Sequence, residues 1–496
     1  MLVMCLSGCA PAPAPVGVVV CSLPPPPPPP QVVTAVVPTG SAVVAEEPKL
    51  PEVVARLQKS ILEGHGASDV VSSLTTEVGA RLAGSPGDKL AVAWALRAMR
   101  AAGLANVHTE PVKVPVWQRG LETASLVAPV PHKLAITALG WSGSTPPNGL
   151  TAEVVRFDSI DALKGADVAK VRGKIVFLDV RMHASSDGPG YGEAVVARAD
   201  GPREAAGKGA VAMVIRSIGS DDTRFPHTGA MKREKSAALA LPAGAISSAD
   251  ADLLERVLAL PAGNPAPRLS VTLTPRWLPD ADSANVVGEV VGRERPSDVV
   301  LLGAHLDSWD LGEGAIDDGA GCGIVLEAAR ALLGVTAKPR RTVRVVLFAA
   351  EENSLAGGKA YAVAHAAEVS THVAALEADS GTNRVLHAAL RGAPDARGAF
   401  QGLASLLAPL GVTLVDKEAH GGADVSPLEA LGVPIVDMSQ DPSHYFDHHH
   451  TANDVFARID KGALAQASAA FATMAWGIAE LPGDLGRIPE ADRAHK

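Results

Sequence analysis

The chain has 496 residues, and its 44 Lys and Arg against 54 Asp and Glu give a formal net charge of −10. This acidic balance lacks the basic footprint of nucleic-acid-binding proteins, so nucleic acid is not expected among the partners. Hydrophobic residues make up 47% and aromatic residues only 3%, which indicates a core of Ala, Val and Leu packed over large regular elements.

Residues 1–48 are expected to form an export signal and a spacer. Leu6-Ser7-Gly8-Cys9 resembles a bacterial lipobox, in which signal cleavage leaves a lipid-modified cysteine. The stretch before Cys9 is short and carries no Lys or Arg, which leaves an upstream start open. Prolines 24–30 predict an extended spacer. We expect a cell-envelope lipoprotein anchored at Cys9 or a secreted protein; a solvated tail without function is the alternative.

Residues 49–120 are expected to begin the main domain. Apolar residues at helical spacing between Pro51 and Leu104 predict two or three helices, interrupted by the turn cluster 84–87. The alternation from Val107 to Trp117 predicts a strand. No later stretch offers the roughly 20 apolar residues of a membrane-spanning helix.

Residues 121–280 are expected to form a unit of their own, rich in alternating strands and helices. It lacks clustered His, Asp or Glu, so its expected role is to frame the substrate. The loop from Arg224 to Gly229 is a candidate ligand-facing loop, although an ordinary surface turn is the favoured interpretation. The predicted elements are a strand at 174–178, a helix at 201–208, a strand at 210–215 and a helix at 248–260.

Residues 281–482 show near-continuous apolar strands alternating with helices, and residues 483–496 are expected to be a tail. The predicted strands are 299–304, 343–349, 373–378 and 433–438. Runs of this kind belong to strands buried on both faces, so the fold class is α/β, with a mostly parallel sheet flanked by helices. In such sheets ligands bind at the carboxyl ends of the strands.

Acidic and imidazole side chains gather at these strand ends. They are His305 and Asp307, Asp317 and Asp318, Glu351 and Glu352, Asp379, and His444 with His448, His449 and His450. Several carboxylates in one cleft repel each other unless a cation neutralises them. Imidazole and carboxylate without thiolate suit zinc, cobalt or manganese, with zinc the default and two ions favoured over one. Ordinary solvated loop residues are the alternative.

The order of these residues resembles the successive motifs of the cocatalytic-zinc exopeptidases. The motifs are Gly303-Ala304-His305-Leu306-Asp307-Ser308-Trp309, Gly314-Ala315-Ile316-Asp317-Asp318-Gly319, Glu351-Glu352, Glu377-Ala378-Asp379 and His450-Thr451-Ala452-Asn453-Asp454. That family includes bacterial aminopeptidases and glutamate carboxypeptidases, and the resemblance is greatest to its carboxypeptidase Q branch. It covers residues 50–480 approximately and implies a protease-associated-like domain inserted at 121–280.

The resemblance implies a set of metal ligands. Asp317 would bridge two zinc ions, with His305 and Asp379 completing one site and Glu352 and His450 the other. His449 is the reserve for His450, because the three consecutive histidines leave the last ligand open.

The resemblance also implies the remaining roles. Glu351 would be the general base of a metal-assisted hydrolysis, Asp307 would orient His305, and the Asp317–Asp318 bond is a candidate cis peptide. Neither Gly-x-Ser-x-Gly nor His-Glu-x-x-His is present, which argues against a serine hydrolase and a single-zinc helical motif.

The predicted function is therefore a dinuclear zinc exopeptidase acting on small peptides, of the carboxypeptidase type. An aminopeptidase on the same scaffold is the first alternative, because the sequence does not decide which peptide terminus is recognised. A non-catalytic receptor-like protein is the second, although such proteins lose metal ligands. A homodimer is a candidate assembly.

Overall fold

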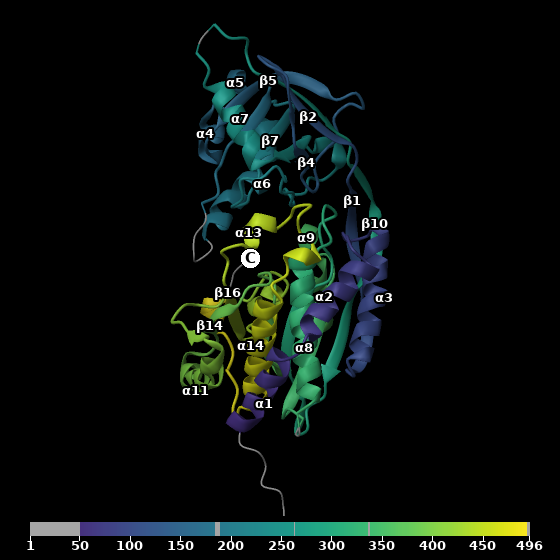
Figure 1. Cartoon of the computed structure of the whole chain (residues 1–496), viewed down its shortest axis with the longest axis vertical. Coiled ribbons are helices and arrows are strands. Elements are labelled where there is room, and N and C mark those ends of the chain that lie inside the picture. Colours follow the sequence, from purple (N-terminus) through teal and green to yellow (C-terminus); the bar gives the residue numbers. More distant parts are fainter. Residues whose placement is uncertain (1–49, 184–188, 262, 336–337, 494–496) are drawn as a thin grey trace, which may run out of the picture. The chain divides into compact units, whose positions relative to one another are not determined.

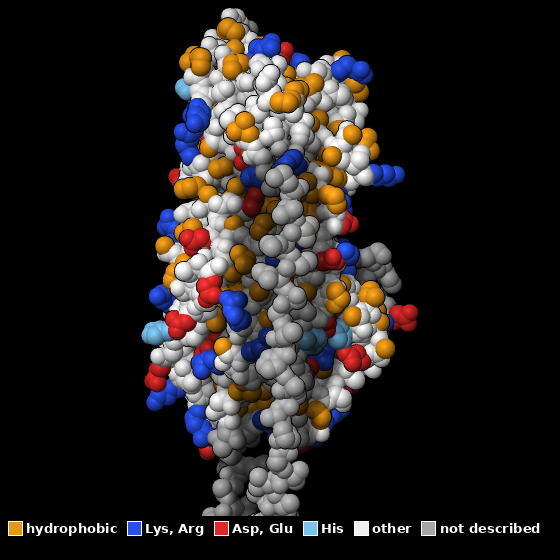
Figure 2. Space-filling model, turned by 90° about the vertical axis from the view of Figure 1, so that its right-hand side faces the viewer, with side chains coloured by type: hydrophobic (Ala, Val, Ile, Leu, Met, Phe, Trp, Pro, Cys, Tyr) orange, Lys and Arg blue, Asp and Glu red, His pale blue; other side chains and the backbone are white. Residues whose placement is uncertain are grey.

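The structure is a computed structural model that describes residues 50–183, 189–261, 263–335 and 338–493. The lipobox-like segment, Cys9 and the proline-rich spacer lie outside the described residues. Within the described ranges, no helix is both long enough and apolar enough to cross a membrane. On the face shown in Figure 2, basic and acidic side chains are interspersed over the described surface.

The first sheet has eight strands in the order β1-β10-β12-β11-β13-β16-β14-β15. Their bounds are β1 (Ala105–Gln118), β10 (Arg276–Val290), β11 (Arg295–His305), β12 (Arg341–Phe348), β13 (His372–Glu377), β14 (Val385–Arg391), β15 (Thr413–Leu414) and β16 (Ile435–Gln440). The four predicted apolar strands are the central β12, β11, β13 and β16, and all three of their pairings are parallel. The prediction of a mostly parallel α/β sheet is confirmed for this centre, while β1, β10 and β14 add antiparallel pairings at the flanks.

Helices rich in small apolar residues cover this sheet. In Figure 1, α1 (Leu50–Leu62), α2 (Gly66–Glu77), α8 (Ala320–Leu333) and α14 (Lys461–Glu480) lie side by side, and each contacts at least one other of the group. Their buried faces are mainly Ala, Val, Leu and Ile, so they approach the strands closely and bury the hydrophobic surface that drives folding.

The predicted turn cluster at 84–87 marks the start of a helix. In α3 (Pro86–Ala101) the Ser85 hydroxyl accepts a hydrogen bond from the Asp88 backbone N–H, and Pro86 occupies the first helical position. Both are typical helix-start features. The shorter helices of this region are α9 (Glu351–Ser354), α10 (Ala356–Ala364), α11 (Arg397–Leu407), α12 (Ser426–Ala430) and α13 (Tyr445–His448).

The second sheet is built from strands between Glu122 and Leu273, in the order β3-β2-β9-β5-β6-β7-β8-β4. The strands are β2 (Glu122–Ala128), β3 (His132–Leu134), β4 (Ile136–Ala138), β5 (Leu150–Phe157), β6 (Ile175–Leu178), β7 (Ala212–Arg216), β8 (Ala243–Ile246) and β9 (Arg268–Leu273). Its helices are α4 (Ile160–Gly165), α5 (Val168–Val171), α6 (Pro189–Gly207) and α7 (Ser248–Leu258). The first sheet resumes at Arg276, which pairs with Gln118.

Candidate active site

The predicted ligands meet at the carboxyl edge of the parallel strands. His305 is the last residue of β11, Glu352 lies in α9 directly after β12, and Asp379 follows β13. Asp317 precedes α8, and His450 follows α13. All are buried except Asp379, which is half-buried. His305 and His450, which are 145 positions apart in the chain, therefore belong to the same cluster.

Asp317 lies between two imidazoles and presents one carboxylate oxygen to each. His305 Nε2 is 3.1 Å from Asp317 Oδ1 and 3.7 Å from Asp379 Oδ1. On the other side, His450 Nε2 is 3.2 Å from Asp317 Oδ2 and 3.1 Å from Glu352 Oε2. Donor atoms of His305, Asp317 and Glu352 all lie within 4.8 Å of one another.

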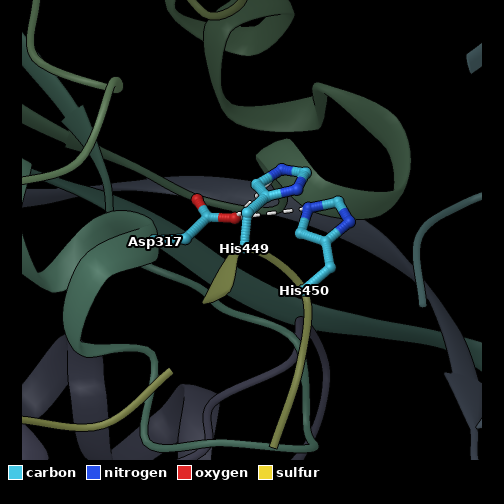
Figure 3. A group of neighbouring side chains, drawn as sticks. All are labelled: Asp317, His449 and His450. Atoms are coloured by element: carbon cyan, nitrogen blue, oxygen red, sulfur yellow. Dashed lines mark ion pairs between the residues drawn. The ribbon is translucent and has the colours of Figure 1, made fainter. Parts of the chain in front are cut away.

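His449 and His450 both face the Asp317 carboxylate, as Figure 3 shows. Their rings stack with centroids 3.5 Å apart, and His449 Nε2 lies 3.5 Å from Asp317 Oδ2. The closer imidazole is that of His450, which also approaches Glu352. The backbone of His450 is left-handed, with φ of 63°, and this turn brings two consecutive side chains to the same carboxylate.

Two further carboxylates hold the backbone around Asp317. Asp318 accepts hydrogen bonds from the backbone N–H groups of His305 at 3.0 Å and Gly321 at 2.9 Å. Asp454 accepts from the N–H groups of Ile316 at 2.6 Å and Asp317 at 3.3 Å. The Asp317–Asp318 peptide bond is cis, as the resemblance implied.

Asp307 contacts both His305 and the Glu351 backbone. The Nδ1 atom of His305 lies 3.0 Å from the Asp307 backbone carbonyl and 3.6 Å from its carboxylate. A ring nitrogen facing a carbonyl carries the proton, so in the neutral imidazole that binds a metal ion the Nε2 lone pair would point toward Asp317 and Asp379. The Asp307 carboxylate accepts a hydrogen bond from the Glu351 N–H at 2.9 Å. Asp307 therefore contacts His305 chiefly through its carbonyl and the Glu351 backbone through its side chain.

Burial dominates the electrostatics of the site. It raises the pKa of Glu351 and of Glu352 well above the ordinary value, and the neighbouring carboxylates add to the effect. Burial acts in the same direction on Asp317, but hydrogen bonds from His305 and His450 hold the pKa of Asp317 well below its ordinary value. Burial also lowers the pKa of His449 and of His450, which favours the neutral imidazoles that bind metals.

The donor set fits divalent metal ions. Among the described residues, the buried atoms Glu352 Oε1, Asp307 Oδ2 and His449 Nδ1 have no hydrogen-bond partner. Buried carboxylate oxygens are seldom left unpaired. A cation bound beside Glu352 would satisfy the free Glu352 oxygen and offset the repulsion between the carboxylates.

A cavity of about 1070 Å³ opens onto this cluster. Asp317, Glu351, Glu352 and Asp379 line it on one side. Tyr445 and Arg198 line it as well, and Arg198 comes from helix α6 of the second sheet. A volume of this size admits a small peptide.

The loop 224–229 lies partly against the site, so the favoured prediction of an ordinary surface turn is wrong for its second half. His227 Nδ1 is 2.7 Å from the His449 carbonyl, and the Thr228 N–H donates to the His450 carbonyl at 2.9 Å. Both side chains are buried because the 449–450 segment packs on them, whereas Arg224 is exposed and pairs with Asp250.

His444 and His448, which the sequence grouped with the other acidic and imidazole side chains, lie outside the cluster. His444 is exposed and pairs with Asp447, while His448 ends α13 and its Nδ1 atom lies 3.2 Å from Asn453 Nδ2. The contributions of Arg198 and Tyr191 to the cavity were not predicted from the sequence. Their segments lack the strand-end pattern that revealed the other residues.

Comparisons with known proteins agree with this architecture. Residues 285–475 match the model of peptidase family M28. Carboxypeptidase Q of Bos taurus is 37% identical over 418 residues, covering 84% of this chain and 85% of that protein. The crystal structure of a peptidase M28 precursor from Shewanella amazonensis SB2B is 44% identical, covers 89% of this chain and 99% of that one, and has a TM-score of 0.85. A zinc aminopeptidase from Bacillus subtilis, 21% identical with 82% of this chain and 93% of that one covered, shares the fold at a TM-score of 0.60.

Proposed function

The chain belongs to peptidase family M28, and we propose that it is a carboxypeptidase Q-like exopeptidase that hydrolyses the terminal peptide bond of small peptides. The observation that carries this proposal is that the predicted ligands converge on Asp317, which lines a cavity large enough for a small peptide. The 37% identity to carboxypeptidase Q over most of both chains supports the same activity.

We propose that the site holds two zinc ions. Asp317 would bridge them, with His305 and Asp379 on one ion and Glu352 and His450 on the other. The approach of Asp317 to both histidines supports this division, and a site of imidazole and carboxylate ligands suits zinc. When bound, the ions would polarise the scissile carbonyl and activate a water molecule.

Glu351 is the proposed general base. It borders the cavity next to the ligand Glu352, and Asp307 fixes its backbone. Burial raises the pKa of the Glu351 carboxyl, which brings it nearer to the range in which a carboxyl can both accept and release a proton. Glu351 takes the proton of the attacking water and passes it to the leaving amine.

The unit 121–280 is proposed to be a protease-associated-like insert that frames the substrate. Its contacts with the site support this role, since His227 and Thr228 bind the backbone of His449 and His450. We also propose export, with Cys9 as a lipid-modified anchor. The support for that is the lipobox-like sequence Leu6-Ser7-Gly8-Cys9.

Two alternatives make different predictions. An aminopeptidase would use the same cluster, but the aminopeptidase relative above is only 21% identical and shows the fold alone. A non-catalytic receptor-like protein would not need the complete set of proposed ligands together with Glu351, and these are all present.

The test is a panel of dipeptides blocked at either terminus. We expect hydrolysis of dipeptides with a free carboxyl group, loss of hydrolysis after chelator treatment and recovery on adding zinc. Cleavage of carboxyl-blocked peptides alone would favour the aminopeptidase. Absence of any peptide hydrolysis by the zinc-loaded protein would contradict the proposed function.

A further inference from the structure

His227 is a buried histidine in the loop 217–228, which follows β7 of the second sheet. Its side chain is fully buried and does not belong to the described residues that line the main cavity. The Nδ1 atom lies 2.7 Å from the His449 carbonyl, and the Nε2 atom lies 2.7 Å from Asp221 Oδ1. Because a carbonyl can only accept, Nδ1 carries a proton and donates it to this carbonyl. The second sheet region thus binds the segment that carries the proposed ligand His450.

The same loop makes further hydrogen bonds to the chain between Phe446 and His450. The Ser220 N–H donates to the Phe446 carbonyl at 3.1 Å, and the Ser220 hydroxyl donates to Asp447 Oδ1 at 2.7 Å. The Thr228 N–H donates to the His450 carbonyl at 2.9 Å, and the Thr228 carbonyl lies 3.3 Å from His450 Nδ1. The loop therefore contacts both the backbone and the imidazole of His450.

These contacts hold an unusual backbone conformation at His450. Its φ of 63° is left-handed, which residues other than glycine adopt rarely and only when the surrounding structure holds them there. The angles φ and ψ of His450 are rotations of the two peptide planes that meet at its Cα atom. His227 binds the carbonyl of the first plane, and Thr228 binds the carbonyl of the second. Within the described chain the first plane makes no other hydrogen bond, so its orientation depends on His227.

The backbone of His450 decides where its imidazole points. In the observed conformation His450 Nε2 lies 3.2 Å from Asp317 Oδ2 and 3.1 Å from Glu352 Oε2. Because φ and ψ set the direction of the Cα–Cβ bond, a rotation of the first plane would carry the ring away from these oxygens. Residues that orient a metal ligand without touching the metal typically contribute 10- to 100-fold to metal affinity.

We propose that His227 is a positioning residue for the metal ligand His450, so that the second sheet region completes a metal site built mainly on the first sheet. This inference rests on the proposed two-zinc site. The His227 ring is itself held in place by Asp221 on one side and by Gly219 on another. A Cβ atom at Gly219 would lie 2.3 Å from His227 Cε1, so glycine is required for the ring to lie there.

The experiment measures the zinc affinity of each of the two proposed sites. His227→Phe keeps a ring of similar size and removes both nitrogen atoms. We expect it to weaken the site of Glu352 and His450 by about 10- to 100-fold, and the site of His305 and Asp379 by less than about threefold. Chelator-competition titration of the metal-free protein with zinc gives the two affinities. Anomalous diffraction from crystals grown at limiting zinc shows which of the two sites is weakened.

Two further variants test the hydrogen bond to the His449 carbonyl. His227→Asn keeps a donor at the position of Nδ1 and should keep both zinc affinities within about threefold of the parent values. His227→Gln moves the donor one bond further, toward Asp221, and should weaken the His450 site as His227→Phe does. His132→Phe is the matched control, since His132 is an exposed histidine of β3 in the same sheet.

A purely structural role of His227 would lower the stability of the variants and affect both zinc sites alike. Equal loss at the two sites, no loss in His227→Phe, or equal affinities in the Asn and Gln variants would overturn the inference. Thermal unfolding identifies a folding defect, and the comparison of Asn with Gln keeps the test decisive if His227→Phe unfolds. A parent protein that binds fewer than two zinc ions would overturn the proposed metal site itself, and the inference with it.

Discussion

The Asp317 carboxylate is the central contact of the site, because each of its oxygens faces a different imidazole. We expect Asp317→Ala to reduce zinc affinity by more than about 100-fold, since loss of residues that merely support ligands already costs 10- to 100-fold. Elemental analysis after dialysis measures the change. Asp282→Ala is the control, because Asp282 is exposed and pairs with Lys113. Two zinc ions retained in Asp317→Ala would contradict the bridging role.

Glu351 is expected to act as the general base without binding a metal ion. Glu351→Ala should leave the zinc content unchanged and lower kcat by about 10²- to 10⁴-fold, the usual contribution of a general base. Parallel measurement of zinc content and of dipeptide hydrolysis checks both parts. Turnover like that of the parent enzyme would refute the assignment of Glu351 as the base.

At the residue scale, the sequence predicted the side chains that follow buried strands. His305 and Glu352 could be placed together because parallel strands end at one edge of a sheet. Arg198 could not be placed, because it lies inside a helix of a distant segment and its place beside the cavity depends on the tertiary contact of that helix with Thr228. The sequence also left Asp318 undefined, and the structure shows it accepting backbone hydrogen bonds.

The loop between β11 and Asp317 depends on one fully buried arginine. Arg81 donates hydrogen bonds to the backbone carbonyls of Leu306, Glu313 and Gly314 at 2.6, 2.9 and 2.8 Å. Arg81→Met would leave these carbonyls unsatisfied, so we expect the free energy of unfolding to fall by about 3 to 5 kcal/mol. Urea unfolding measures this fall, with exposed Arg100→Met as the control. A loss below about 1 kcal/mol would show that the loop is held by other contacts.

A histidine links the end of α10 to β1 and makes stability depend on pH. His365 Nε2 lies 2.8 Å from the Glu110 carboxylate. Burial lowers the pKa of His365, but hydrogen bonds to Glu110 and Glu368 outweigh it, so the net pKa is raised. The stabilisation is therefore complete below the unfolded-state pKa of about 6.5 and is lost as pH rises through the higher folded-state value.

His365→Gln should consequently destabilise the protein more at pH 6 than at pH 9. Glu110 stays ionised at both values, because its pKa is lowered by His365 despite burial. Urea unfolding of both proteins at the two pH values makes the comparison. Equal destabilisation at pH 6 and pH 9 would contradict the charged pair.

At the element scale, α6 shows why the sequence did not predict the first part of this helix. The sequence predicted a helix at 201–208, whereas α6 begins at Pro189 and contains Pro202. Pro and Gly disfavour helices locally, but packing overrides that preference. A Cβ atom at Gly201 would lie 2.6 Å from the Met213 side chain, so glycine allows the helix to lie closely on β7.

At the scale of the whole molecule, contacts between the two sheet regions connect the second sheet to the candidate site. Arg119 binds Asp310 through both carboxylate oxygens, and the Trp141 indole N–H donates to the Asn353 carbonyl at 2.9 Å. These contacts fix the loop that carries Asp307 and the helix α9 that carries Glu352. The sequence predicted both α/β regions from their periodicity, but it could not predict how they meet, since that depends on single long-range contacts.

The proposed mechanism requires two zinc ions joined by Asp317. Anomalous diffraction at the zinc absorption edge from crystals of the zinc-loaded protein tests this claim most directly. We predict two peaks roughly 3.5 to 4 Å apart, one beside His305 and Asp379 and the other beside Glu352 and His450, with Asp317 touching both. A single peak, or peaks away from Asp317, would contradict the account.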